Sequence, residues 1–289
     1  RAAYWQDDIL YTFAHLSLDE SEPQLASLFV NNQLYHQTKP QNLKVSGTPV
    51  HYMLLVDTST SMPNYRSSIL SLAEKLMSEQ TNIVVSVARF DRVVSVVAER
   101  LTDWDAVKST LSSLRYNGDG SDISGSVAEM VAYLGANQYP AGELTNLVVI
   151  TDGEPWYSNN QEIEVEREAA SNLAAQKVTE AYPEVLIHTY SFDVWNEDLY
   201  TALSGGNGLH FVGEPVAEAG KALAEFSNAL YAISFPLGGY EEQSYIRSAL
   251  MLNISNQFVS YGDVRNTGIV PELDVDNTQL DNPEESSAP

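Results

Sequence analysis

The sequence contains no cysteine among its 289 residues. This absence excludes disulfide bonds, thiolate metal sites and a cysteine nucleophile. Positive charge is also scarce, because 15 Lys and Arg residues stand against 39 Asp and Glu residues and give a net charge of −24. Such a field repels nucleic acids and anionic membrane surfaces and attracts cations. The composition therefore favours cation binding and disfavours nucleic-acid binding.

Several other signals are missing. No apolar run approaches the roughly 18 residues that a membrane span needs. There is no phosphate-binding loop, no dinucleotide fingerprint and no Gly-x-Ser-x-Gly elbow. The five histidines are not paired at the i, i+4 spacing of a helical zinc site. Because 44% of the residues are hydrophobic, we expect a globular protein with a sizeable core, as one large domain or two smaller ones.

The chain is organised around the segment HYMLLVDTSTSM, residues 51–62. Tyr52 to Val56 form a near-continuous apolar run, which is typical of a strand buried on both faces in a parallel sheet. The run ends at Asp57, and Ser59 and Ser61 follow at alternate positions. Ligands of open α/β sheets bind past the carboxyl ends of the strands, and one carboxylate with two hydroxyls suits a hard cation such as Mg²⁺. The alternative is a capped helix start, since Ser and Asp also satisfy free N–H groups.

Strand and helix patterns alternate from this segment onward. Apolar runs predict further strands at residues 83–90, 93–98, 147–151, 185–192 and 209–212. Apolar stripes and capping signals predict helices around residues 69–76, 103–114, 127–134, 162–182, 196–203 and 217–231. The two-residue gap before Val93 to Ala98 is too short for a parallel crossover, so that strand should be antiparallel. We therefore expect an α/β fold, with a doubly wound, mostly parallel sheet, one antiparallel edge strand and helices on both faces.

The two flanks have strand-like patterns of their own. Strands are expected at residues 7–18, 24–30 and 33–38, and alternation returns at residues 244–259 after a Pro/Gly break. We predict that these segments pair with one another as an accessory β module. The expected organisation is an N-terminal β segment at residues 1–49, the α/β domain at 50–235, a C-terminal β segment at 236–261 and an acidic linker or tail at 262–289.

Two more loops at predicted strand ends carry oxygen ligands: Gly120-Ser121-Asp122 and Thr151-Asp152-Gly153. Together with Asp57-x-Ser59-x-Ser61, they resemble the von Willebrand factor type A domain and its metal-ion-dependent adhesion site. The resemblance covers roughly residues 50–232, and it is to bacterial surface or secreted members in particular. It implies that the metal ligands are Asp57, Ser59, Ser61, Ser121 and Asp152. Ser121 stands where the family usually has threonine, and it keeps the hydroxyl that binds a metal.

The resemblance also implies a function, which is to bind an acidic residue of a protein or matrix partner through Mg²⁺, with Mn²⁺ and Ca²⁺ as alternatives. Mostly neutral ligands leave the ion with positive charge and an open position that a partner carboxylate fills. In the family, movement of the last helix can alter affinity. Four residues near the site are candidates for contact with the partner: Asp122, Glu154, Trp156 and Tyr157. For Asp122 a turn-forming role is favoured, and the two aromatic residues have packing against a neighbouring loop as their alternative.

Three functions compete. The preferred one is an adhesion-type binding module at the cell surface or outside the cell, with no enzymatic activity. The second is a cytoplasmic adaptor of the same fold that works with an AAA+ ATPase in complex assembly. The third is a Mg²⁺-dependent phosphatase with Asp57 as nucleophile, but Ser59 stands where such sites commonly carry an acid/base.

Overall fold

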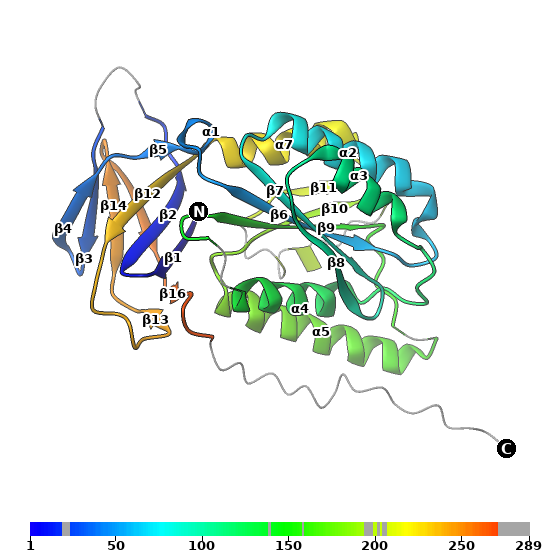
Figure 1. Ribbon diagram of the computed structural model, residues 1–289. Helices are drawn as coiled ribbons and strands as arrows, with labels where there is room; N and C mark the ends of the chain where they lie inside the picture. The colour runs from blue at the N-terminus through cyan, green and yellow to red at the C-terminus, as the bar shows by residue number, and fades with distance from the viewer. Residues whose placement is uncertain are drawn as a thin grey trace.

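The computed structural model describes residues 1–18, 24–137, 140–157, 159–193, 199–200, 203 and 207–270. The chain forms an α/β part, built from residues 50–229, and a β part, built from both flanks, which lie side by side (Figure 1). None of the helices in these ranges is long and apolar enough to cross a membrane.

The α/β part is built on a sheet with the strand order β11-β10-β9-β6-β7-β8 in the described ranges. Its strands are β6 (Val50–Asp57), β7 (Ile83–Phe90), β8 (Val94–Leu101), β9 (Leu144–Thr151), β10 (Leu186–Ser191) and β11 (His210–Val212). Neighbouring strands are parallel except at β8, which runs antiparallel to β7. The mostly parallel sheet with one antiparallel edge strand is therefore confirmed.

Helices cover both faces of this sheet (Figure 1). One face packs against α2 (Arg66–Glu79), α3 (Trp104–Ser113) and α7 (Val216–Asn228), and the other packs against α4 (Ile123–Ala136) and α5 (Gln161–Ala181). Because side chains of a strand alternate, Tyr52 and Leu54 of β6 enter the first core while Met53 and Leu55 enter the second. All eight residues of β6 are buried, which explains the unbroken apolar run in the sequence.

The β part consists of two further sheets with a shared core (Figure 1). One has the order β13-β16-β1-β2-β12-β5, from β1 (Ala2–Gln6), β2 (Ile9–His15), β5 (Gln41–Asn42), β12 (Leu230–Pro236), β13 (Tyr245–Ile246) and β16 (Val264–Asn266). The other has the order β15-β14-β3-β4, from β3 (Ala26–Val30), β4 (Gln33–Thr38), β14 (Leu250–Ile254) and β15 (Gln257–Tyr261). Strand β14 pairs with β3, so the two flanks form one β structure as predicted.

The structure corrects several boundaries. Strand β1 was not predicted; it forms a hairpin with β2 through Asp7 and Asp8, which both have positive φ. The last helix of the α/β part ends at Asn228 and not at residue 231. The domain boundary predicted at residue 235 falls inside β12, because this strand pairs with β2 and β5 and so belongs to the β part. The helix predicted at residues 196–203 lies largely outside the described residues.

The acidic tail predicted from residue 262 does not begin there, since Val264–Asn266 form the buried strand β16. Arg265 of this strand is only 2% exposed. Its Nε donates to Glu184 Oε1 at 2.5 Å, its Nη2 donates to the Gly135 carbonyl at 2.9 Å, and its guanidinium lies over the ring of Tyr182. These contacts tie the β part to the α/β part. The predicted tail from residue 271 onward lies outside the described residues.

Candidate metal centre

Asp57 ends strand β6 and is completely buried. Its Oδ1 accepts a hydrogen bond from the backbone N–H of Ser59 at 2.8 Å. Its Oδ2 accepts hydrogen bonds from Ser121 Oγ and from Thr151 Oγ1, both at 2.8 Å. One carboxylate therefore joins three segments that are far apart in the sequence.

The hydrogen bond to Asp57 also orients the hydroxyl of Ser121. A hydroxyl has one proton and two lone pairs, so a proton given to Asp57 leaves the Ser121 oxygen able to act as an acceptor or a metal ligand. Ser121 is 3% exposed. The structure thus brings Asp57 and Ser121, two of the predicted ligands, into direct contact.

The hydroxyls of Ser59 and Ser61 share a hydrogen bond, with their oxygens 3.0 Å apart. Adjacent ligands of an octahedral ion with bonds of about 2.0–2.1 Å lie about 2.9 Å apart, so this pair has the spacing of one octahedral edge. Ser59 is 7% exposed, whereas Ser61 is exposed. The two hydroxyls therefore face the boundary between interior and solvent, where an ion could be reached by a partner.

The loop that carries Ser121 is fixed by its backbone on both sides. The N–H of Gly118 donates to the Thr58 carbonyl at 3.0 Å, and Thr60 N–H donates back to Gly118 at 3.2 Å. Ser121 and Trp156 exchange two backbone hydrogen bonds of 2.9 and 3.0 Å. The position of Ser121 therefore does not depend on its side chain alone.

Asp152 follows the end of strand β9, which pairs in parallel with β6. It therefore lies on the same edge of the sheet as Asp57. Its carbonyl accepts hydrogen bonds from Ser191 Oγ at 2.9 Å and from Asp193 N at 3.3 Å, while its Oδ1 accepts from the Glu154 N–H at 3.4 Å. Asp152 as a whole is partly exposed.

Burial raises the pKa of Asp57, and the hydrogen bonds from Ser59, Ser121 and Thr151 oppose this shift. Within the described residues, Asp57 forms no ion pair with a lysine, arginine or histidine. A buried carboxylate without a countercharge is costly. A bound cation would supply that countercharge.

The donor set suits a hard divalent cation. In the described part of the chain, no cluster of three or more His, Cys, Asp or Glu side chains could hold a metal. The candidate ligands at this sheet edge are instead hydroxyls, with the Asp57 carboxylate in contact with Ser121 and with Asp152 following the end of the neighbouring strand β9. Hydroxyl, carboxylate and water oxygens match Mg²⁺ or Mn²⁺ and not Zn²⁺, which prefers nitrogen and sulfur.

Two of the four candidate contact residues have internal roles. Tyr157 is 4% exposed, and its N–H donates to both carboxylate oxygens of Glu164 at 3.0 Å, so it belongs to the interior and not to a contact surface. Asp122 caps helix α4, because its Oδ1 accepts from Gly125 N at 2.8 Å while its Oδ2 accepts from Ser171 Oγ at 3.1 Å. Glu154 and Trp156 are exposed and stay candidates for contact.

The sequence interpretation missed several neighbours of the site. The sequence assigns Thr151 no role in the site, although its hydroxyl donates a hydrogen bond to Asp57. A second neighbour is Asp193, whose N–H donates to the carbonyl of Asp152. Tyr65 donates a hydrogen bond to Asp193 Oδ2, which raises the pKa of Tyr65 to about 12. The ring of Tyr65 stacks on Phe192 at a centroid distance of 4.1 Å. No sequence signal links Tyr65 to Asp193, because 128 positions separate them.

The buried histidines have structural roles. His188 in β10 shares a hydrogen bond of 3.1 Å with Asn146 Oδ1, and its Nδ1 accepts from the Leu209 N–H at 3.0 Å. Asn146 Nδ2 donates to the carbonyl of His51, which fixes the orientation of the amide. His188 must therefore be neutral, with its proton on Nε2. Burial lowers the pKa of His188 to about 3, and burial with the nearby Arg100 lowers the pKa of His51 to about 3.

These shifts predict a pH-dependent loss of stability. Both pKa values fall below the value of 6.5 in the unfolded chain, so the folded protein favours the neutral form of each histidine. The contribution of the two histidines to the free energy of unfolding is therefore complete above pH 6.5 and is lost as pH falls toward 3. At pH 5 each histidine should lower the free energy of unfolding by about 2 kcal/mol relative to pH 8. Urea denaturation at pH 5 to 8 measures this. His188→Gln should reduce the pH-dependent loss by about half, whereas the exposed His36→Gln should leave it unchanged. Equal pH dependence in all three proteins would contradict the assignment.

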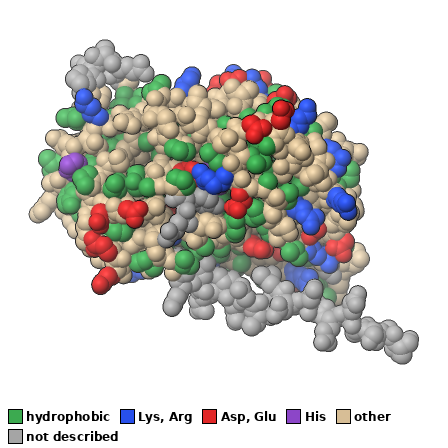
Figure 2. Space-filling model, viewed as in Figure 1, with side chains coloured by type: hydrophobic (Ala, Val, Ile, Leu, Met, Phe, Trp, Pro, Cys, Tyr) green, Lys and Arg blue, Asp and Glu red, His purple; other side chains and the backbone are tan. Residues whose placement is uncertain are grey.

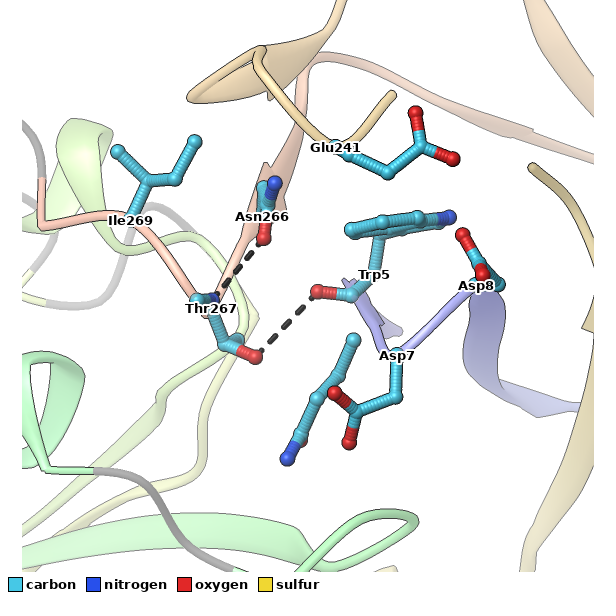
Figure 3. A pocket seen from close by; sticks show the side chains of 9 residues that line it. Trp5, Asp7, Asp8, Glu241, Asn266, Thr267 and Ile269 are labelled. Carbon is cyan, nitrogen blue, oxygen red and sulfur yellow. Dashed lines mark hydrogen bonds between the residues drawn. The ribbon is translucent and has the colours of Figure 1, made fainter. Parts of the chain in front are cut away.

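A hollow of about 350 Å³ lies in the β part (Figure 3). Trp5, Asp7, Asp8 and Glu241 line it, and Figure 3 shows the Trp5 indole between Glu241 on one side and Asp7 on the other. The neighbouring Glu241 carboxylate raises the pKa of Asp8. No candidate metal ligand lines this hollow, so it is separate from the sheet edge that carries Asp57.

The fold and the site together define a doubly wound α/β domain with a hydroxyl-rich oxygen cluster at the carboxyl ends of its strands. Residues 52–154 match the family model of the von Willebrand factor type A domain. The chain therefore carries a von Willebrand factor type A domain. Comparison with curated protein sequences finds no match.

Several solved structures have a similar fold. An aerotolerance-related membrane protein from Bacteroides fragilis is 19% identical, with 62% of this chain and 98% of that chain covered and a TM-score of 0.48. The vWF domain of the type V pili tip protein Mfa5 from Porphyromonas gingivalis is 10% identical, with coverages of 63% and 95% and a TM-score of 0.48. A von Willebrand factor type A protein from Catenulispora acidiphila is 9% identical, with coverages of 91% and 73% and a TM-score of 0.47. Values this low establish no functional relationship.

Proposed function

We propose that this domain is a divalent-metal-dependent binding module that holds an acidic residue of a protein partner. Mg²⁺ or Mn²⁺ would be held by Ser59, Ser61 and Ser121, with Asp57 and Asp152 beside it. When bound, the ion would offer an open coordination position to a carboxylate oxygen of the partner. The observation that carries the proposal is the buried Asp57, which binds hydroxyls from two other loops and has no cationic partner in the described ranges.

The roles of the chain's own residues follow from their contacts. Asp57 orients Ser121 and Thr151 by accepting their hydroxyl protons, and it fixes the first loop through the N–H of Ser59. The fixed loops keep the hydroxyl oxygens close together before a partner arrives, which lowers the entropic cost of binding. Exposed Glu154 and Trp156 would contact the partner around the site.

A phosphatase is less consistent with this geometry. A carboxylate nucleophile must reach the phosphorus atom of the substrate, but Asp57 is 0% exposed and both of its oxygens accept hydrogen bonds. We therefore propose a binding role without catalysis. Turnover of p-nitrophenyl phosphate that requires Mg²⁺ and Asp57 would overturn this choice.

The proposal predicts that partner capture depends on a metal. Immobilised protein should retain a partner from cell-surface extracts in Mg²⁺ and lose it in EDTA. Asp152→Ala should lose the partner in Mg²⁺ as well. Asp119→Ala, which removes a carboxylate that is 84% exposed in the neighbouring loop, should still retain it. Retention of the same partner by wild-type protein in EDTA would contradict the proposal.

The preferred location at the cell surface or outside the cell remains part of this proposal. It predicts that the protein is accessible to an externally added protease in intact cells. Detection only in the cytosol would favour the adaptor role with an AAA+ ATPase.

A further inference from the structure

Arg92 lies in the short turn between β7 and β8 and crosses the loop that carries Ser121. A Cβ atom added to Gly120 would lie 2.5 Å from Arg92 Nε, so the arginine side chain packs directly on this glycine. Its Nη2 donates to the carbonyl of Asp119 at 3.2 Å. The guanidinium is therefore next to the residue that precedes Ser121.

Trp156 contacts the same guanidinium. The Arg92 Cζ atom lies 5.1 Å from the centroid of the indole ring, a distance at which a cation and an aromatic face attract. Trp156 also exchanges two backbone hydrogen bonds with Ser121. Gly120 precedes Ser121 and Trp156 is hydrogen-bonded to it, so these contacts place a positive charge against the loop that carries this candidate metal ligand.

The charge of Arg92 is available to a partner. The side chain is 38% exposed, and Nη1 has no hydrogen-bond partner in the described residues. The one ion pair of Arg92 in these ranges joins Nε to Asp119 Oδ1 at 3.8 Å, and Asp119 is 84% exposed. Such a long and solvated pair contributes little. A ligand carboxylate can therefore compete with Asp119 for the guanidinium.

The net negative charge of the chain makes a positive side chain near the site more important for binding an acidic partner. The chain has a net charge of −24, which opposes the approach of an acidic partner. Figure 2 shows that most of the Lys and Arg side chains visible in this view lie over the α/β part. A local cation next to the metal site would offset the repulsion where the partner docks.

We infer that Arg92, supported by Trp156, is a second anchor and that the partner is a protein segment with two acidic side chains. One would complete the metal site and the other would pair with Arg92. This inference rests on the proposed function. A planar guanidinium binds a carboxylate through two parallel hydrogen bonds, which lysine cannot reproduce.

Synthetic peptides test the inference without a known partner. Ten-residue Gly/Ser peptides would carry one Glu, or two Glu separated by one to six residues, and their binding would be measured in Mn²⁺ and in EDTA. For the wild-type protein, the best two-Glu peptide should bind on the order of 10-fold tighter than the one-Glu peptide. Arg92→Ala should remove this advantage, and Arg92→Lys should restore only part of it.

The control is Arg247→Ala, which removes an arginine of the β part whose side chain is 76% exposed, and it should keep the two-Glu preference. Asp119→Asn should strengthen binding of the two-Glu peptide, because it removes the competing carboxylate. Mn²⁺ titration of each variant distinguishes two causes of weaker peptide binding. A variant that has lost only the second anchor keeps its affinity for Mn²⁺, whereas a variant whose metal site is disrupted does not.

Two different failures can be told apart. If Mn²⁺-dependent binding occurs but Arg92→Ala keeps the full two-Glu preference, the second anchor is wrong and the proposed function stands. If the wild-type protein binds neither Mn²⁺ nor any peptide, the proposed function itself fails. A phosphoserine peptide that binds tighter than every two-Glu peptide would also overturn the assignment of a carboxylate ligand.

Discussion

Asp57→Asn is expected to weaken Mn²⁺ binding on the order of 10- to 100-fold. Asparagine keeps the shape of the side chain and one oxygen acceptor, but it removes the negative charge that faces the proposed ion. It also cannot reproduce the full set of hydrogen bonds that Asp57 accepts from Ser59, Ser121 and Thr151. Isothermal titration with MnCl₂ measures the change. Partner binding in Mg²⁺ should then fall to the level of the wild-type protein in EDTA.

A matched control separates the lost ligand from a general charge effect. Asp119→Asn makes the same chemical change in the loop that carries Ser121, at a side chain that is 84% exposed. Its affinity for Mn²⁺ should match that of the wild-type protein. Circular dichroism checks that both variants are folded. Equal Mn²⁺ affinity in Asp57→Asn and the wild type would remove Asp57 from the site.

Arg265→Ala is expected to lower the free energy of unfolding by about 3–5 kcal/mol. The substitution leaves Glu184 buried without its cation, and it removes the hydrogen bond to the carbonyl of Gly135 and the contact with the ring of Tyr182. Because Arg265 belongs to β16 and the other three residues belong to the α/β part, the loss should loosen the contact between the two parts. Urea denaturation measures the change.

A second substitution tests the physical cause. Glu184→Gln in the Arg265→Ala background removes the unpaired buried charge, so it should recover a substantial share of the lost stability. Arg247→Ala, at an exposed position of the β part, should cost less than about 1 kcal/mol. A loss below 1 kcal/mol for Arg265→Ala, or no recovery in the double variant, would refute the buried ion pair as a main contact between the parts.

The sequence predicted the α/β sheet well because its signals are local. The buried strand from Tyr52 to Val56 appears as an unbroken apolar run, and the short gap before β8 alone requires an antiparallel strand. The predicted helix runs on to residue 231 because apolar residues follow α7 without a break, whereas residues 230–236 form strand β12. Pairing with β2 and β5 decides their structure, and such long-range pairing leaves no local signal.

The site was predictable in part for a similar reason. Asp57, Ser59 and Ser61 lie within five residues and form a local pattern. Ser121 is predicted as a ligand only from the family resemblance. The hydrogen bonds from Ser121 and Thr151 to Asp57 depend on how the loops meet in space. Arg92 had no signal at all, because its place beside Ser121 depends on the close approach to Gly120. For Tyr157 the sequence leaves partner contact and packing open, because a loop aromatic can face either solvent or the core, and in the structure it is buried.

The most direct test is a crystal of this chain grown or soaked with MnCl₂ and measured for the anomalous scattering of manganese. The proposal predicts one strong peak at about 2.0–2.3 Å from the hydroxyl oxygens of Ser59, Ser61 and Ser121. It predicts no such peak in crystals of Asp57→Asn. Manganese bound elsewhere, or hydroxyls of these three serines that face unrelated parts of the molecule, would contradict it.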